Sequence, residues 1–143
     1  MDYEKPFIYI DTNFAPDEAL MTYMATKSYD FELVGLSTGS GMMNTKLAAE
    51  NLVGLSASED LYLSVAAGED FSDYHLLDKK IFITTKDYVE EIPAFENIID
   101  KASDCGKLDI IATAGLTNIA KALDEASDCL LYTSDAADDT PCV

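Results

Sequence analysis

Cysteine, histidine and basic residues are scarce in this sequence, and their scarcity excludes several classes of function. The three cysteines, Cys105, Cys129 and Cys142, form no C-x-x-C pair, so we expect free thiols instead of a disulfide framework or a zinc site. The single histidine, His75, lies in an irregular stretch, and we interpret it as a surface residue. One histidine gives serine-hydrolase chemistry little support.

Basic side chains number 9 against 27 acidic ones, which gives a net charge of −18 and a sequence pI near 4.1. Proteins that bind nucleic acids carry a basic face, and anionic membranes repel acidic proteins. We therefore expect neither nucleic acid nor a membrane among the partners. The acidic residues are scattered along the chain, which is typical of a solvated acidic surface.

Long apolar segments are missing as well. No run approaches the length of a membrane span, and residues 1–5 lack the basic and apolar regions of a signal peptide. These features predict a cytoplasmic protein. The composition, 48% hydrophobic and 25% charged, is ordinary for a globular domain, and 143 residues are enough for one core.

Apolar runs alternate with helical patterns along the chain. The short runs predict strands at residues 7–11, 31–38, 61–66 and 108–113, with a weaker strand-like run at 81–84. Helical spacing predicts helices at residues 16–27, 44–55, 95–102 and 117–126. In the first helix the spaced apolar residues are Ala19, Leu20, Tyr23 and Met24. The alternation predicts βαβ units, and hence a Rossmann-like open, mostly parallel sheet with helices on both faces.

Three carboxylates gather around the end of the first predicted strand. Asp11 closes the strand, and Asp17 and Glu18 open the helix that follows. Ligands of open α/β sheets bind outside the carboxyl ends of the strands, and oxygen ligands suit calcium or magnesium. An acid-rich first helical turn accounts equally well for Asp17 and Glu18 without any function. Asp11 is harder to explain in that way, because carboxylates facing one another repel unless a cation or a proton intervenes.

Gly39-Ser40-Gly41 follows the second predicted strand and resembles the start of a dinucleotide-binding fingerprint. The third glycine is absent because residue 44 is Asn. We therefore interpret these glycines as a tight turn that needs glycine conformations.

Four stretches, in order, resemble the inosine-uridine preferring nucleoside hydrolase family over residues 5–126. Residues 11–19, DTNFAPDEA, lie on the family's D-T-D-P-G-x-D-D-A signature without a gap. Residues 35–51 follow its second strand, Gly-Asn turn and helical Asn, and residues 65–68 its next glycine turn. Residues 112–118, ATAGLTN, correspond to A-T-G-P-L-T-N. The resemblance implies hydrolysis of the N-glycosidic bond of ribonucleosides, with calcium at the floor of the pocket.

Residue roles follow from the same resemblance. Asp11 is similar to the metal-binding Asp that also accepts a proton from the attacking water, and Asp17 to the residue that binds the ribose hydroxyls. Glu18 stands where the family has a metal-binding Asp, and Thr113 where a backbone carbonyl binds the metal. The implied partner is a small-molecule nucleoside. The resemblance also allows a homo-oligomer of the longer protein from which this chain would derive.

The sequence departs from the family pattern at several of these positions. Asn13 replaces an Asp, Phe14 and Ala15 replace Pro-Gly, and Met42 replaces the Asn of the Gly-Asn turn. These changes fit either a divergent hydrolase or an inactive paralogue that binds a nucleoside or sugar. A phosphatase-like enzyme with Asp11 as nucleophile is a third reading, but residue 13 is not the usual second Asp.

Family members are much longer, and a further metal-binding Asp and a His come from their second half. Residues 1–128 are therefore expected to be the N-terminal part of such a domain, with little or no turnover alone. Residues 129–138 also match a translated transposon-end adaptor used in sequencing libraries. We interpret residues 129–143 as a non-native or disordered tail, with an ordinary acidic tail as the alternative.

Overall fold

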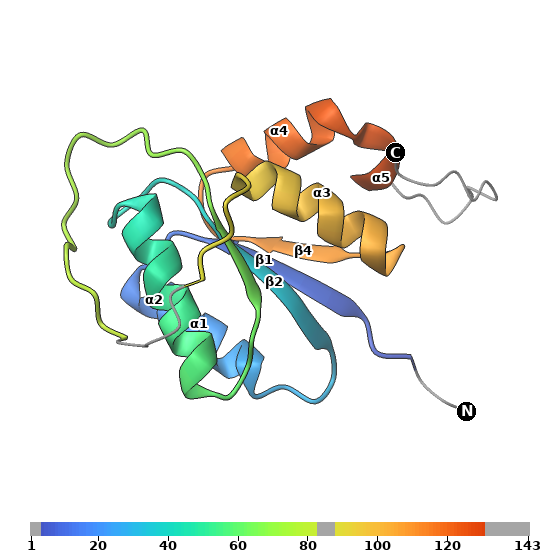
Figure 1. Ribbon diagram of the computed structural model, residues 1–143, viewed down its shortest axis with the longest axis horizontal. Coiled ribbons are helices and arrows are strands. Elements are labelled where there is room, and N and C mark those ends of the chain that lie inside the picture. Colours follow the sequence, from blue (N-terminus) through green and yellow to red (C-terminus); the bar gives the residue numbers. More distant parts are fainter. Residues whose placement is uncertain (1–3, 83–87, 131–143) are drawn as a thin grey trace.

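Strands and helices alternate along the chain in the computed structural model, which describes residues 4–82 and 88–130. Figure 1 shows the arrangement. The strands are β1 (Phe7–Thr12), β2 (Glu32–Thr38), β3 (Ser64–Ala67) and β4 (Asp109–Ala112). The helices are α1 (Pro16–Thr26), α2 (Thr45–Ser58), α3 (Ala94–Cys105), α4 (Thr117–Glu125) and α5 (Ser127–Leu130).

All pairs within the four-stranded sheet are parallel, and the strand order is β3-β2-β1-β4. The first three strands therefore run outward in one direction, and β4 returns to the other side of β1. This reversal creates a topological switch point between β1 and β4, where the crevice of an open α/β sheet forms. The expected fold class, an open parallel α/β sheet, is confirmed.

Helices cover both faces of the sheet, as Figure 1 shows. Ile8, Ile10 and Leu36 belong to the core under α2, whereas Tyr9 packs with Ile98 of α3 and Ala122 of α4. Successive side chains of a strand alternate between faces. Asp11 therefore shares the α3 and α4 side with Tyr9, and this places its carboxylate within reach of α4.

The helix α1 turns a different face to the core than its apolar spacing suggests. Leu20, Tyr23 and Met24 are exposed, whereas Thr22 is fully buried and Met21 packs against the core. Of the predicted apolar set only Ala19 packs against the core, and the inner face is completed by Met21, Thr22 and Ala25. Glu18 is partly buried at the start of the helix, where its carboxylate accepts hydrogen bonds from the preceding loop.

Two strand predictions need correction. The third strand begins at Ser64 and not at residue 61, and Ile81 and Phe82 lie in no strand. Residues 83 and 84 of the strand-like run lie outside the described residues. From Gly68 to Pro93 the described chain forms no helix or strand, although residues Met43 and Leu77 make an isolated bridge. Within the described residues, no helix has both the length and the apolar character that a membrane span requires.

At the C-terminal end, residues 127–130 form the short helix α5. Residues 131–143 lie outside the described residues, so the interpretation of residues 129–143 as a non-native or disordered tail stays a prediction.

Candidate functional site

Asp11 is the centre of the candidate site. It is the second-last residue of β1 and is fully buried. It pairs with Ser37 of β2 on one side and with Ala112 of β4 on the other. Its Oδ1 atom accepts hydrogen bonds from Ser37 Oγ at 2.6 Å and from Asn118 Nδ2 at 3.0 Å. Two neighbouring elements, β2 and α4, therefore hold one oxygen of this carboxylate.

The other oxygen, Asp11 Oδ2, is buried and has no hydrogen-bond partner among the described residues. Burial raises the pKa of Asp11, and the nearby Glu18 charge raises it further, although the hydrogen bonds from Ser37 and Asn118 oppose this shift. An unpaired buried carboxylate oxygen is costly, and such groups in folded proteins usually point to a missing ion, water or proton. The site therefore favours a cation or a proton at Oδ2.

Thr113 lies beside Asp11, directly after β4. Its backbone N donates to the Asp11 backbone carbonyl at 2.8 Å, and its Oγ1 donates to the same carbonyl at 3.3 Å. These bonds extend the pairing of β1 with β4 by one residue. The structure thus brings Asp11 and Thr113 together at the switch point, although they are 102 positions apart in the sequence.

Glu18 approaches the same loop from α1. Its Oε2 accepts hydrogen bonds from Thr12 Oγ1 and Asn13 N, both at 3.0 Å, and from Ala15 N at 3.4 Å. The carboxylate therefore holds the loop that joins β1 to α1, and it shares the Ala15 N donor with Asn13 Oδ1, which accepts from it at 2.9 Å. This structural role is independent of any metal.

Asp17 is exposed in the first turn of α1, one residue from Glu18. Among the described residues, no group of three or more His, Cys, Asp or Glu side chains is arranged to hold a metal ion. The structure therefore brings Asp11, Glu18 and Thr113 to one end of the sheet, but it does not gather Asp11, Asp17 and Glu18 into a finished cluster.

The loop after Asp11 carries a strained residue. Phe14 has φ +58°, while Ala15 has an unstrained φ of −62°. The left-handed conformation costs a non-glycine residue about 1–2 kcal/mol. Phe14 is held there by burial of its ring, which packs edge-to-face against Phe82 at 6.3 Å between centroids. Proline, the family residue at this position, cannot adopt this φ, so the loop differs from a Pro-Gly turn.

Gly39 and Gly41 are needed for close approach and not for special backbone angles. Neither has a positive φ, contrary to the turn interpretation. A Cβ atom at Gly39 would lie 2.7 Å from Ala114 Cβ, and one at Gly41 would lie 2.6 Å from Asn13 Cβ. The small residues therefore let the loop after β2 pack tightly against the loops after β1 and β4.

Ser37 belongs to a G-x-S-x-G pattern, Gly35-Leu36-Ser37-Thr38-Gly39, which is a possible nucleophile motif. The serine of such a motif must stand exposed on a turn between a strand and a helix. Here Ser37 is fully buried within β2 and donates its hydroxyl hydrogen to Asp11. It therefore supports the carboxylate, and the pattern is no nucleophile elbow.

Asn118 is a residue of the site to which the sequence analysis assigned no role. It lies buried in the first turn of α4, and its Nδ2 donates to Thr38 O at 3.0 Å as well as to Asp11 Oδ1. Its only sequence signal is its place at the end of the stretch 112–118.

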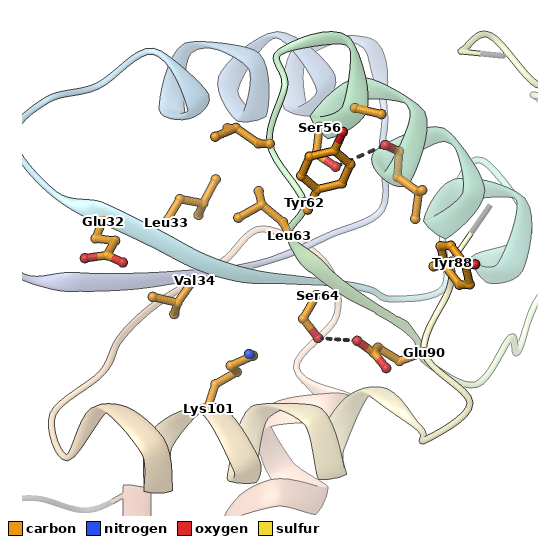
Figure 2. A pocket seen from close by; sticks show the side chains of 13 residues that line it. Glu32, Leu33, Val34, Ser56, Tyr62, Leu63, Ser64, Tyr88, Glu90 and Lys101 are labelled. Carbon is orange, nitrogen blue, oxygen red and sulfur yellow. Dashed lines mark hydrogen bonds between the residues drawn. The ribbon is translucent and has the colours of Figure 1, made fainter. Parts of the chain in front are cut away.

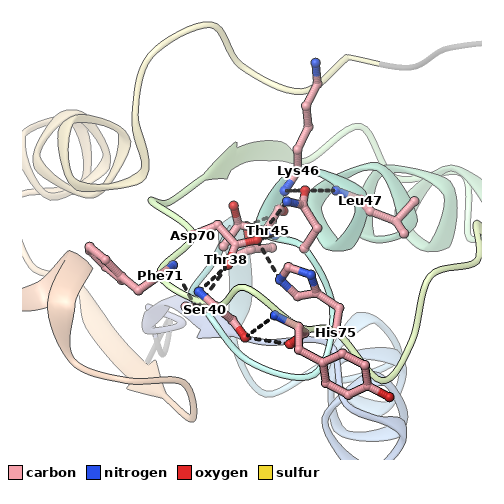
Figure 3. Close-up of polar contacts among 11 residues, drawn as sticks. Thr38, Ser40, Thr45, Lys46, Leu47, Asp70, Phe71 and His75 are labelled. Atoms are coloured by element: carbon pink, nitrogen blue, oxygen red, sulfur yellow. Dashed lines mark hydrogen bonds and ion pairs between the residues drawn. The ribbon is translucent and has the colours of Figure 1, made fainter.

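A second polar cluster surrounds Asp70, beside the start of α2, and Figure 3 shows its contacts. Asp70 accepts hydrogen bonds from Ser40 Oγ, Asn44 Nδ2 and Thr45 N, and its Oδ2 lies 2.8 Å from His75 Nε2. Burial alone would raise the pKa of Asp70, but hydrogen bonds from the Ser72 and Thr45 backbones and the nearby His75 together lower it. The His75 side chain is partly buried against this cluster, with 21% of its surface exposed.

A cavity of about 590 Å³ lies at the other end of the sheet (Figure 2). Its lining includes Glu32 and Val34 of β2, Ser64 of β3 and Lys101 of α3, and Glu90 accepts a hydrogen bond from Ser64 across it. Asp11 does not line this cavity. The candidate site is therefore identified by the buried carboxylate and not by the volume of a cavity.

Comparisons with known proteins support the fold. No protein-family model matches the sequence, and a search of curated proteins finds no match. Among solved structures the chain is similar to a plant nucleoside hydrolase, PpNRh1, with a TM-score of 0.71 and 23% sequence identity. The match covers 88% of this chain and 45% of that chain, so the chain spans less than half the length of this neighbour. At this identity the likeness establishes a common fold.

Proposed function

We propose that this chain supplies part of a site that hydrolyses the N-glycosidic bond of ribonucleosides. The observation that carries the proposal is the fully buried Asp11 at the switch point between β1 and β4, with one oxygen held and the other unpaired. The fold shared with a plant nucleoside hydrolase and the order of the sequence motifs support the same reaction class.

The residues available around Asp11 are compatible with calcium. Asp11 Oδ2 is an oxygen ligand without another partner among the described residues, Glu18 lies in the first turn of α1, and Thr113 directly follows β4. Calcium prefers oxygen ligands and tolerates irregular geometry. When bound, it would lower the pKa of a water molecule and orient it for attack. We propose Asp11, Glu18 and Thr113 as its protein ligands.

In the proposed reaction Asp11 accepts a proton from the attacking water. Departure of the base leaves a sugar with oxocarbenium character, and carboxylates below the ring stabilise this developing positive charge. Asp17, exposed at the start of α1, binds the ribose hydroxyls and fixes the ring in place. The nucleoside is thus bound through its sugar at this end of the sheet.

Three protein ligands are few for calcium, which takes 6–8 oxygen atoms. We therefore expect the 143-residue chain to bind calcium weakly and to show little or no turnover. The activity is proposed for a protein that completes the coordination sphere, since the matched structure is more than twice as long as the matched region.

Calorimetric titration of the purified chain with calcium, with and without ribose, tests the proposal. We expect weak calcium binding that Asp11→Asn abolishes, and the exposed Asp73→Asn variant serves as a charge-matched control. Release of reducing sugar from inosine and uridine is measured in parallel. Absence of both calcium and ribose binding would overturn the proposal, and rapid calcium-dependent turnover would refute the expected inactivity of this chain.

A binding protein without catalysis is the second candidate, and the Glu18 contacts favour it. Thr12, Asn13 and Ala15 donate to Glu18 Oε2, so this oxygen has hydrogen-bond partners without a cation. Restoring the family residues with Asn13→Asp, Ala15→Gly and Met42→Asn, within a longer parent protein, separates the two candidates. A protein that binds ribose but gains no hydrolysis after this restoration is a binding protein.

A further inference from the structure

Asn118 connects the ends of three strands on the face covered by α4. Its Nδ2 donates one hydrogen bond to Asp11 Oδ1 at the end of β1 and another to Thr38 O at the end of β2, each at 3.0 Å. Gly68, directly after β3, lies so close that a Cβ atom there would be 2.6 Å from Asn118 Oδ1. The amide is therefore fixed in position and orientation by its surroundings.

Asp11 Oδ1 receives two donors from different directions, Ser37 Oγ from β2 and Asn118 Nδ2 from α4. A single hydrogen bond leaves a carboxylate free to turn about that bond, whereas two donors on one oxygen restrict it. If one donor is removed, the carboxylate can turn about the hydrogen bond that remains, and its second oxygen no longer points in a fixed direction. The donors thus fix the direction in which the other oxygen points.

We infer that Asn118, together with Ser37, is a positioning residue that fixes the Asp11 side chain in one rotamer and reserves Oδ2 for the reaction. The inference rests on the proposed function for its purpose, but the contacts that support it are independent of any metal. Groups that orient a metal-binding or catalytic side chain commonly change affinity by about 10- to 100-fold when removed.

Nuclear magnetic resonance of the metal-free chain tests the positioning directly. The three-bond couplings between the Hα and Hβ protons of Asp11 report whether its χ1 angle occupies one rotamer. We expect a single rotamer in the wild-type chain and averaged couplings in Asn118→Ala. Unchanged couplings in a folded Asn118→Ala variant would overturn the inference.

Asn97→Ala is the matched control. Asn97 is also a buried helical asparagine on this side of the sheet, but its side chain bonds to the Tyr9 hydroxyl at 2.7 Å and to Ser64 Oγ at 2.8 Å. Its truncation removes a buried amide without touching Asp11. We expect Asp11 to keep its single rotamer in this variant, and averaging there as well would mean that Asn118 acts only through general stability.

Terbium luminescence gives a second readout, because this ion binds calcium ligands. We expect terbium affinity to fall about 10- to 100-fold in Asn118→Ala and to stay within about twofold in Asn97→Ala. If the wild-type chain binds no terbium, the proposed metal fails, and the rotamer measurement alone decides the positioning role.

If Asn118→Ala does not fold, Ser37→Ala replaces it, because this variant removes the other donor to Asp11. We expect averaged couplings in Ser37→Ala as well, and a single Asp11 rotamer there would overturn the inference.

Discussion

Gly68 and Asn118 are in such close contact that no side chain fits between them. A Cβ atom at position 68 would lie 2.4 Å from Thr38 O and 2.6 Å from Asn118 Oδ1. Gly68 N also donates to Thr38 O at 2.9 Å, so this carbonyl receives hydrogen bonds from both residues. The ends of β2 and β3 and the start of α4 are thereby joined at a single carbonyl.

Gly68→Ala should therefore destabilise the fold and displace Asn118. We expect a loss of about 1–3 kcal/mol in the free energy of unfolding, the usual cost of forcing a group into a packed region. Urea denaturation measures this loss. Gly115→Ala is the control, since a Cβ atom there would meet nothing within 4 Å. Equal stability of the two variants would contradict the close packing at Gly68.

Asp11→Asn should increase stability in the absence of calcium, by about 1 kcal/mol at neutral pH, because the variant buries no charge. The pKa of Asp11 is raised in the folded state, so the folded chain binds more protons than the unfolded chain once the pH exceeds 3.8. Wild-type stability then falls as the pH rises from 3.8 through the raised pKa, and the advantage of the variant grows over the same interval.

Thermal unfolding of both proteins across this pH range, with a chelator present, measures the difference. Asp17→Asn is the control, because Asp17 is exposed and its replacement should change stability by less than about 0.5 kcal/mol. Added calcium should reduce the advantage of Asp11→Asn. An advantage that shrinks with rising pH would contradict the burial of an unpaired carboxylate.

Asp70→Asn should have the opposite pH dependence. The pKa of Asp70 is lowered in the folded state, so the ionised side chain stabilises the fold above its ordinary value of 3.8. This stabilisation is lost as the pH falls through the lowered pKa. We expect the variant to be less stable by about 1–3 kcal/mol near neutral pH, since an amide would face several donors.

The difference between wild type and Asp70→Asn should vanish in strong acid, and urea denaturation at several pH values measures it. Asp73→Asn, an exposed change in the same segment, should leave stability nearly unaltered. A constant difference at all pH values would show that the charge of Asp70 plays no part.

A pair of variants at position 14 measures the backbone strain of Phe14. Both Phe14→Ala and Phe14→Gly lose the buried ring, at a cost of about 3–5 kcal/mol. Glycine usually destabilises relative to alanine, but at φ +58° it should be the more stable of the two by about 1 kcal/mol. Chemical denaturation of the two variants gives the comparison, and a more stable alanine variant would contradict the left-handed conformation.

The apolar periodicity of the sequence predicted much of this fold, because local patterns determine local structure. The alternation of runs such as residues 7–11 with helical spacing in residues 44–55 indicated an open parallel sheet, and β1 and α2 confirm it. Local patterns are weaker where tertiary contacts compete. Leu20, Tyr23 and Met24 have core spacing but are exposed, because Met21, Thr22 and Ala25 take the inner face of α1.

For the candidate site, too, some features follow from the sequence and others only from the tertiary structure. The sequence alone placed Asp11 near the end of a strand and Asp17 and Glu18 at the start of a helix, and the structure confirms both. Only the tertiary structure decided that Asn118 and Ser37 hold one oxygen of Asp11, while the other has no hydrogen-bond partner in the part of the chain that the structure describes. Contacts between residues 107 positions apart depend on strand order and register, and no local pattern encodes these.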